Sequence, residues 1–170
     1  MVMNDRVEFY EKNLERVNYW LQFAEAKNAA MIAFVVAILA VLSSFFEKHL
    51  VMLLVVSIVY LCGMIISICS MFPKGNMNVD EKDGEYKETD NLLYWKDIAK
   101  YSKTDYVETV NQRLFANVNQ NTLNDYEIML AEEIIANARI ANYKYSKFDL
   151  ASKVVIVGTV LVPIFLIIIA

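Results

Sequence analysis

The stretch Ser43–Leu54, "SSFFEKHLVMLL", sets the polar residues Glu47–His49 between two long uncharged runs. Ala29–Phe46 has 18 residues without a charge, and Leu50–Phe72 has 23. A bilayer core of about 30 Å is crossed by roughly 20 apolar helical residues, so the second run spans outright and the first is short but sufficient. We expect this stretch to be the turn of a transmembrane hairpin.

A third uncharged run, Val154–Ala170, has 17 residues. The chain has 170 residues, about one domain, and is 57% hydrophobic but 21% charged, so its charges lie between the runs. A helix of this length spans only about 25 Å, and Lys153 would have to extend to the interface. We predict three spans; a non-spanning tail is the alternative for the third.

Orientation follows from the basic residues near the ends of the spans. With three spans, residues 1–28 and 73–153 share one side of the membrane. That side carries nine lysines and arginines close to the spans, against Lys48 alone on the other side. The positive-inside rule therefore predicts that 1–28 and 73–153 are cytoplasmic. The net charge of -4 gives no basic field suited to double-stranded nucleic acid.

Helical periodicity extends the spans into the polar segments. An apolar stripe at spacings of three and four runs through Val7, Tyr10, Leu14, Val17, Leu21 and Ala24. No Gly or Pro separates this stripe from the first span, so both are expected in one helix. Small residues, which let membrane helices approach closely, line the first span at Ala26, Ala30, Ala33, Ala37, Ala40 and Ser44 and the second at Gly63, Ser67 and Ser70.

The segment between the second and third spans is expected to be helical after a solvated loop, Lys74–Asp90. Thr89 or Asp90 is predicted to cap a helix that carries Leu92, Leu93, Trp95, Ile98 and Ala99. Ser102 with Asp105 predicts a second helix start of the capping-box type. The Asn-rich stretch 117–124 predicts a turn, after which Thr122 with Asp125 opens a helix that continues into the third span.

The predicted fold class is an all-α membrane protein. Three transmembrane helices, 29–46, 50–72 and 154–170, are joined to a cytoplasmic helical bundle. Extensions of the first and last spans form this bundle together with one or two inserted helices in 73–153.

Catalytic chemistry has little support in the sequence. His49 is the single histidine, and Cys62 and Cys69 are seven residues apart in a predicted span, so no metal-ligand spacing occurs. No Gly-rich phosphate loop and no Ser beside a plausible base is present. We expect no enzyme, no metal and no cofactor.

The uncharged spans bear on transport, because pumps usually place ionisable residues at depth. Three helices cannot enclose a conducting path, so any pore must be formed by several copies. The candidate pore-lining residues are hydroxyl side chains, and helix packing is the alternative for each: Ser43, Ser44, Ser57, Ser67 and Ser70.

Three segments resemble the transmembrane effectors of the Pycsar anti-phage system. "LQFAEAKNAAMIAF" (Leu21–Phe34) is similar to the start of the family's first span. "DNLLYWKDIAKYSKTDYVE" (Asp90–Glu108) is similar to the helix that follows a Pro closing the second span, here Pro73. "ANARIANYKYSKFDLA" (Ala136–Ala151) is similar to the helix leading into a C-terminal span.

The resemblance implies a bacterial defence effector of the inner membrane. In such systems a co-encoded cyclase or nucleotidyltransferase makes a nucleotide signal, a cyclic pyrimidine nucleotide in the Pycsar system itself. The signal changes the state of the membrane protein, and membrane integrity is lost. The resemblance thus implies a regulatory nucleotide, whose identity the sequence does not give, and the lipid bilayer as a partner.

An anionic nucleotide would contact Arg or Lys beside an aromatic face. Two stretches offer this combination, and a solvated helix face is the alternative for both. The ligand-binding candidates are Trp95, Lys96, Lys100 and Lys103, with Tyr101 beside them, and Arg139, Tyr143, Lys144 and Lys147.

Two functional hypotheses follow. The favoured one is a homo-oligomeric channel or pore controlled through its cytoplasmic helices. The alternative is a non-conducting membrane adaptor whose cytoplasmic bundle docks a protein partner.

Overall fold

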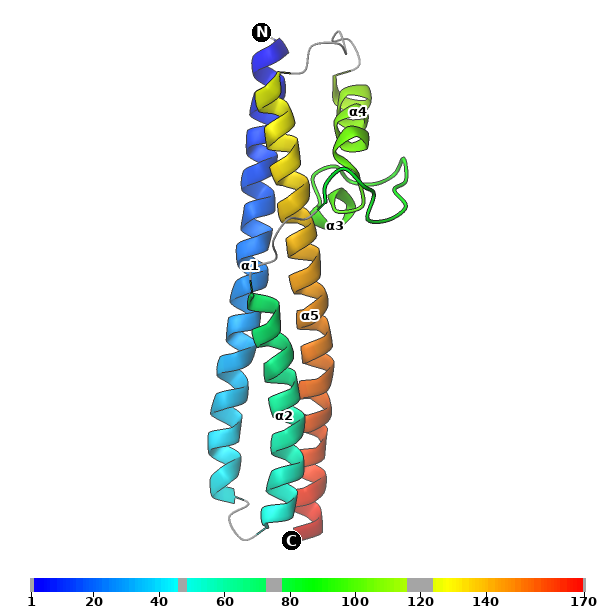
Figure 1. Cartoon of the computed structure of the whole chain (residues 1–170). Coiled ribbons are helices and arrows are strands. Elements are labelled where there is room, and N and C mark those ends of the chain that lie inside the picture. The colour runs from blue at the N-terminus through cyan, green and yellow to red at the C-terminus, as the bar shows by residue number, and fades with distance from the viewer. Residues whose placement is uncertain (1, 46–48, 73–77, 116–123, 170) are drawn as a thin grey trace. The chain divides into compact units, whose positions relative to one another are not determined.

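The computed structural model describes residues 2–45, 49–72, 78–115 and 124–169 (Figure 1). No strand occurs in these ranges. The elements are α1 Val2–Phe45, α2 Leu50–Met71, α3 Trp95–Ile98, α4 Lys103–Leu114 and α5 Asp125–Ile169. Three of them, α1, α2 and α5, are long and apolar enough to cross a membrane. The predicted fold class, all-α with three transmembrane helices, is confirmed.

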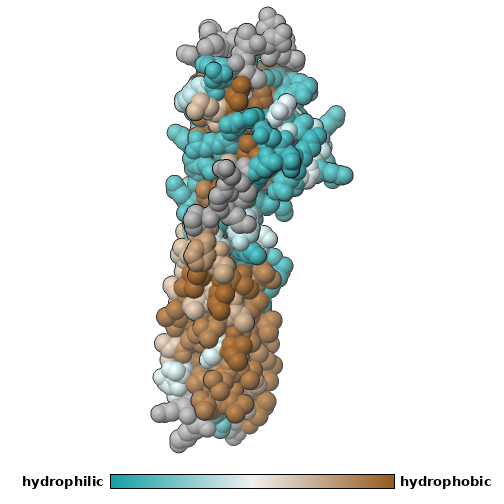
Figure 2. All heavy atoms as spheres, viewed as in Figure 1, coloured by the Kyte–Doolittle hydropathy of each residue, from teal (hydrophilic) through white to brown (hydrophobic). Residues whose placement is uncertain are grey.

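The chain packs as two units. The polar unit consists of Met1–Phe23 and Lys74–Tyr143, and the apolar unit of Ala24–Pro73 and Lys144–Ala170. The boundaries fall inside α1 and α5, each of which is one continuous helix across its boundary. On the face shown in Figure 2, hydrophobic residues cover most of the apolar unit and hydrophilic residues gather on the polar unit. Helix α1 thus runs without a break from the N-terminal stripe through the run 29–45.

The apolar unit is a three-helix packing with a filled interior. Its buried core joins Val35 and Leu42 of α1, Val56 and Tyr60 of α2, and Val155 of α5. A ring of partly buried apolar side chains from the same three helices packs against this core. Because these side chains occupy the space between the helices, the interior holds hydrocarbon rather than a passage.

The helices α2 and α5 approach closely at two glycines. A Cβ at Gly63 would lie 2.7 Å from Cγ2 of Val155 and 3.4 Å from the carbonyl oxygen of Ala151. A Cβ at Gly158 would lie 3.2 Å from the ring of Tyr60. Real Cβ atoms do not approach the stiff side chain of valine so closely, so Gly63 is required for this contact. The predicted small face on the second span packs against α5.

The polar unit buries the apolar stripe predicted on the N-terminal helix. Tyr10 and Val17 are fully buried, as are Ile134 and Ile135 of α5. The short helices add Trp95 and Ile98 of α3 and Tyr106 and Val110 of α4 to this core. The stripe therefore faces the rest of the polar unit, as its heptad-like spacing predicts.

A buried ion pair joins the first turns of α1 and α5. Arg6 donates from Nε to Oε1 of Glu127 and from Nη2 to Oε2, each over 2.8 Å. The side chains are 2% and 0% exposed. Glu127 also accepts the backbone N–H of Asn124 over 3.0 Å, which satisfies a donor at the start of α5. This bidentate geometry fixes the two chain segments against each other.

The helix starts in the inserted segment differ partly from expectation. Ser102 caps α4 through the N–H of Asp105, as predicted. The helix predicted to start at Thr89 or Asp90 begins only at Trp95. The side chain of Asn91 accepts the N–H of Leu93, a local turn bond that competes with helix formation.

Several predictions fall on residues outside the described ranges. They include Glu47 and Lys48 of the hairpin turn, Pro73, Thr122, and all of 117–124 except Asn124. His49 is described: it is exposed and directly precedes α2.

We expect Gly63→Leu to destabilise the apolar unit, because its side chain would have to enter the contact with Val155. The loss is expected to be about 1–3 kcal/mol, as for other overpacked cores. Cys62→Leu is the matched control, since Cys62 is exposed on the same helix. Unfolding in mixed detergent–SDS micelles, followed by circular dichroism, measures both. Equal stability of the two variants would contradict the close approach.

Candidate functional site

The first predicted ligand cluster lies at α3, in the polar unit. Trp95 is buried at the start of this helix, and Lys96 is exposed. The ammonium of Lys100 lies 3.0 Å from a carboxylate oxygen of Asp90 and 2.7 Å from one of Asp97. This lysine therefore already has two anionic partners.

Lys103, the first residue of α4, is held in the same way. Its ammonium contacts the carboxylate of Glu132 on α5 and lies 3.3 Å from that of Asp80. The hydrogen bond to Glu132 raises the pKa of Lys103 above its ordinary value. A ligand phosphate at either lysine would have to compete with carboxylates. The ligand role stays a prediction for Trp95, Lys96, Lys100 and Lys103.

Arg139 of α5 fastens the segments on either side of α3. Its side chain is buried, and it donates to the carbonyl oxygens of Ala99 over 3.1 Å, Tyr101 over 2.8 Å, Glu81 over 2.6 Å, and Asn78. Burial lowers the pKa of this guanidinium, but arginine stays cationic at neutral pH. We call Arg139 and these four carbonyl groups the carbonyl cradle. The cradle ties the inserted segment to α5.

Lys144 joins three helices within the apolar unit. Its buried ammonium donates to the carbonyl oxygen of Ser70 on α2 over 3.2 Å and lies 3.1 Å from the carboxylate of Glu25 on α1. The amide of Asn28 on α1 donates to the backbone carbonyl of Lys144 over 3.3 Å. We call these four residues, Glu25, Asn28, Ser70 and Lys144, the Lys144 node.

The position of Ser70 explains why a cation is placed there. The last four carbonyl groups of a helix have no partner within it, and α2 ends at Met71. The partial negative charge at a helix C-terminus attracts cations. The ammonium of Lys144 thus satisfies an end carbonyl of α2 and carries the charge that this end favours. The same positive charge attracts the carboxylate of Glu25 on α1.

The second predicted cluster is divided between the units. Arg139 and Tyr143 belong to the polar unit, and Lys144 and Lys147 to the apolar unit. Tyr143 and Lys147 are half-buried. Two cations of the cluster are bound by protein groups: Arg139 by backbone carbonyls and Lys144 by the other residues of the node. A nucleotide role for the four residues stays a prediction.

The candidate pore-lining serines do not share one surface. Ser43 and Ser44 are exposed near the end of α1, and Ser57 is half-buried on α2. Ser67 and Ser70 are buried against the other helices, and Ser70 donates its hydroxyl to the carbonyl of Ser67 over 2.7 Å. Side chains must be at least partly exposed on one copy to line a passage between copies, a condition that Ser43, Ser44 and Ser57 meet. The pore-lining role stays a prediction for all five serines.

A polar cavity that sequence reasoning missed opens in the polar unit, with a volume of about 510 Å³. The guanidinium of Arg113 lines this cavity. It also donates to the carbonyl oxygens of Asp90 and Lys87. The lining residues of the cavity are Tyr86, Glu88, Asp105, Glu108, Thr109, Gln112 and Arg113. They come from two segments more than 15 residues apart, so no local sequence motif predicts the cavity.

A second cation lies beside this cavity. The ammonium of Lys82 is 4.7 Å from the ring centroid of Tyr86 and 3.4 Å from the carboxylate of Asp105. Tyr86 in turn stacks on Tyr101 with centroids 4.4 Å apart. Within the described ranges, no group of three His, Cys, Asp or Glu could hold a metal ion. The cavity therefore offers hydrogen bonds and charge of both signs.

The chain matches a known family model. A family model described as the Pycsar effector protein domain matches residues 9–170, nearly the whole chain. No curated protein and no solved structure matches the chain. The matched range contains the carbonyl cradle, the Lys144 node and the polar cavity.

Lys144→Met should destabilise the apolar unit, because it keeps the aliphatic stem but removes the ammonium from Ser70 and Glu25. The expected loss is about 1.5–3 kcal/mol, the range for hydrogen bonds to a charged group. Lys153→Met on the same helix removes only an exposed pair with Asp149 and should change stability by less than about 1 kcal/mol. Unfolding in mixed micelles measures both, and similar losses would argue against the node.

Arg139→Met should release the inserted segment from α5. The amides of Asp83 and Lys103, which donate to Lys100 and Val79, are expected to exchange with deuterium about tenfold faster or more, since charged hydrogen bonds are lost. Arg16→Met, at an exposed site on α1, is the control. Unchanged exchange at both amides in Arg139→Met would show that the cradle is dispensable.

Proposed function

The chain belongs to the Pycsar effector family, and from this we propose that it is a homo-oligomeric membrane channel or pore-forming protein, gated by a nucleotide-derived signal. Family membership makes it a multi-pass membrane effector of anti-phage defence. The match over residues 9–170 is the observation that carries the proposal. We infer conduction, gating and oligomerisation from the packing, exposure and charge of the described residues.

The filled core of the apolar unit supports an oligomer. Because Val35, Val56, Tyr60 and Val155 occupy its interior, ions would have to pass between copies. The small-residue stripe of α1 is available for contacts between copies, since its members are exposed. Small residues allow such helices to approach closely in lipid. The stripe consists of Ala26, Ala30, Ala33, Ala37, Ala40 and Ser44.

The polar cavity is our proposed site for the nucleotide. Its volume of about 510 Å³ lies within the range of small-molecule pockets. Arg113 would contact the phosphate, and Glu88 and Glu108 would accept hydrogen bonds from amino groups of the base. Three carboxylates line the cavity, so we propose a signal with a single negative charge, as in a cyclic mononucleotide.

Helix α5 is the proposed route of the signal. It carries Arg139 of the carbonyl cradle and Lys144 of the node within five residues, and it is continuous between them. A ligand that moves the inserted segment would act on α5 through Arg139, and Lys144 would pass the movement to α1 and α2. For gating, the nucleotide must bind the open and closed arrangements with different affinity.

We further propose a location and a mode of action. The basic residues near the spans support an inner-membrane protein with residues 1–28 and 73–153 in the cytoplasm, where a co-encoded cyclase or nucleotidyltransferase would make the signal. We propose that the effector acts without catalysis, by permeabilising the membrane. A non-conducting adaptor that docks a protein partner is the competing function.

Reconstitution into liposomes tests the proposal. We expect dye release or single-channel currents that depend on a cyclic mononucleotide. Arg113→Gln should weaken the response about tenfold or more, through the loss of a charged hydrogen bond. Lys96→Gln is the matched control, because Lys96 is exposed and does not line the cavity. Silence with every nucleotide tested, together with a monomeric mass, would favour the adaptor.

Calorimetry combined with the liposome assay separates nucleotide binding from its coupling to release. Lys144→Met should keep nucleotide affinity, measured by calorimetry, but lower the nucleotide-triggered release. Loss of affinity in this variant would instead make Lys144 a ligand contact. Loss of response in Lys96→Gln but not in Arg113→Gln would move the site from the cavity to α3.

A further inference from the structure

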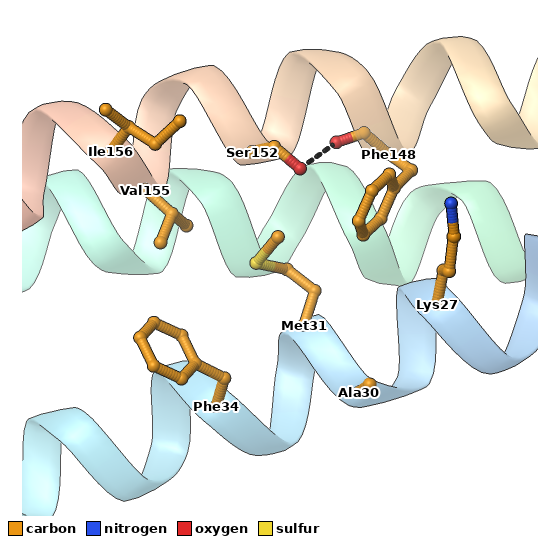
Figure 3. Close-up of a pocket in the computed structure, with 8 residues that line it drawn as sticks. All are labelled: Lys27, Ala30, Met31, Phe34, Phe148, Ser152, Val155 and Ile156. Carbon is orange, nitrogen blue, oxygen red and sulfur yellow. Dashed lines mark hydrogen bonds between the residues drawn. The ribbon is translucent and has the colours of Figure 1, made fainter.

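A groove runs along the apolar unit between α1 and α5, with a volume of about 320 Å³ (Figure 3). From α1 it is lined by Lys27, Met31 and Phe34, and from α5 by Phe148, Val155 and Ile156. From Lys27 to Phe34 it extends about 10 Å along the helix axis. Val155 is buried at its floor, whereas Phe34 and Ile156 are 48% and 60% exposed. The groove is therefore open along its side.

The chemistry of the groove differs between its two ends. The ammonium of Lys27 lies at one end, 5.3 Å from the ring centroids of both Tyr145 and Phe148. Beyond it the lining is apolar, and the hydroxyl of Ser152 donates to the carbonyl of Phe148 over 2.8 Å (Figure 3). No carboxylate lines the groove. One end thus suits an anion and the rest a hydrocarbon chain.

The charged end lies where the first span begins. Lys27 is the last charged residue of α1 before the uncharged run Ala29–Phe46. In the neighbouring segments 24–29 and 144–153 four lysines face two carboxylates, so the excess is positive. Aromatic rings and lysines at this depth are typical of the membrane–water interface. A lipid headgroup occupies the same depth.

We propose that this groove binds an anionic phospholipid. Its phosphate contacts Lys27, and one acyl chain lies over Met31 and Val155, between Phe34 and Ile156. The proposal is independent of the nucleotide. A helix from a second copy is the other candidate occupant, but an apolar helix would bring no anionic group to the ammonium end.

Selectivity arises at the charged end. In a bilayer an acyl chain gains little by exchanging lipid neighbours for apolar side chains, because both are equally apolar. Attraction between Lys27 and a net negative headgroup distinguishes phosphatidylglycerol from phosphatidylcholine. One lysine near the surface corresponds to a preference of about fivefold.

Quenching of tryptophan fluorescence by brominated lipid tests the proposal. A reporter at the groove, Phe34→Trp, is compared with Ile65→Trp, at an exposed position of α2. Each is reconstituted in brominated phosphatidylglycerol or brominated phosphatidylcholine, and the signal of the parent chain, with Trp20 and Trp95, is subtracted. We expect a preference of about fivefold for phosphatidylglycerol at position 34 and none at position 65.

Two lysine variants test the charged end. Lys27→Met should abolish the preference at position 34, whereas Lys153→Met, at a lysine that does not line the groove, should keep it. Equal quenching by the two lipids at position 34, or a preference unchanged in Lys27→Met, would overturn the proposal. Absence of quenching by either lipid at position 34 would also overturn it and assign the groove to a protein helix.

Discussion

The buried ammonium of Lys144 donates to the carbonyl oxygen of Ser70 near the end of α2. Without it, this buried carbonyl would lose a donor, and a buried backbone group that loses a hydrogen bond is costly in free energy. Glu25 and Asn28 attach α1 to the same residue. One lysine thereby fixes the three membrane helices against one another, and the packing of Gly63 on Val155 depends on that alignment.

Helix α5 gives the molecule its functional character. Its polar-unit residues carry the ion pair of Glu127 with Arg6 and the carbonyl cradle of Arg139, and its apolar-unit residues carry the node and the contact with Gly63. One helix thus holds contacts of both units, and in the mechanism we propose it takes the place of a separate coupling domain. Because the core of the apolar unit is filled, the proposed permeation would have to occur between copies.

Much of the fold follows from hydrophobic pattern alone. Runs free of charge define the spans, and the spacing of Tyr10, Val17 and Ala24 defines the buried face of α1. The candidate site is harder to predict from the sequence. A lysine or arginine on a helix gives the same sequence pattern whether its side chain contacts solvent, a carboxylate or a backbone carbonyl. The sequence predicts ligand contacts for Arg139 and Lys144, and it does not show the protein groups that bind them, which lie 38 to 119 residues away in sequence. Helix α3 begins later than predicted because the side chain of Asn91 accepts the N–H of Leu93, a turn hydrogen bond that competes with the helix.

We propose that copies of this chain assemble in the membrane and rearrange on binding a nucleotide. A spin label on Cys62, exposed on α2, in a chain with Cys69→Ser, measures distances between copies directly by dipolar electron paramagnetic resonance in liposomes. We expect a defined distance distribution that shifts when a cyclic mononucleotide is added. Dipolar coupling no stronger than that of randomly distributed monomers, or a distribution that no nucleotide changes, would contradict it.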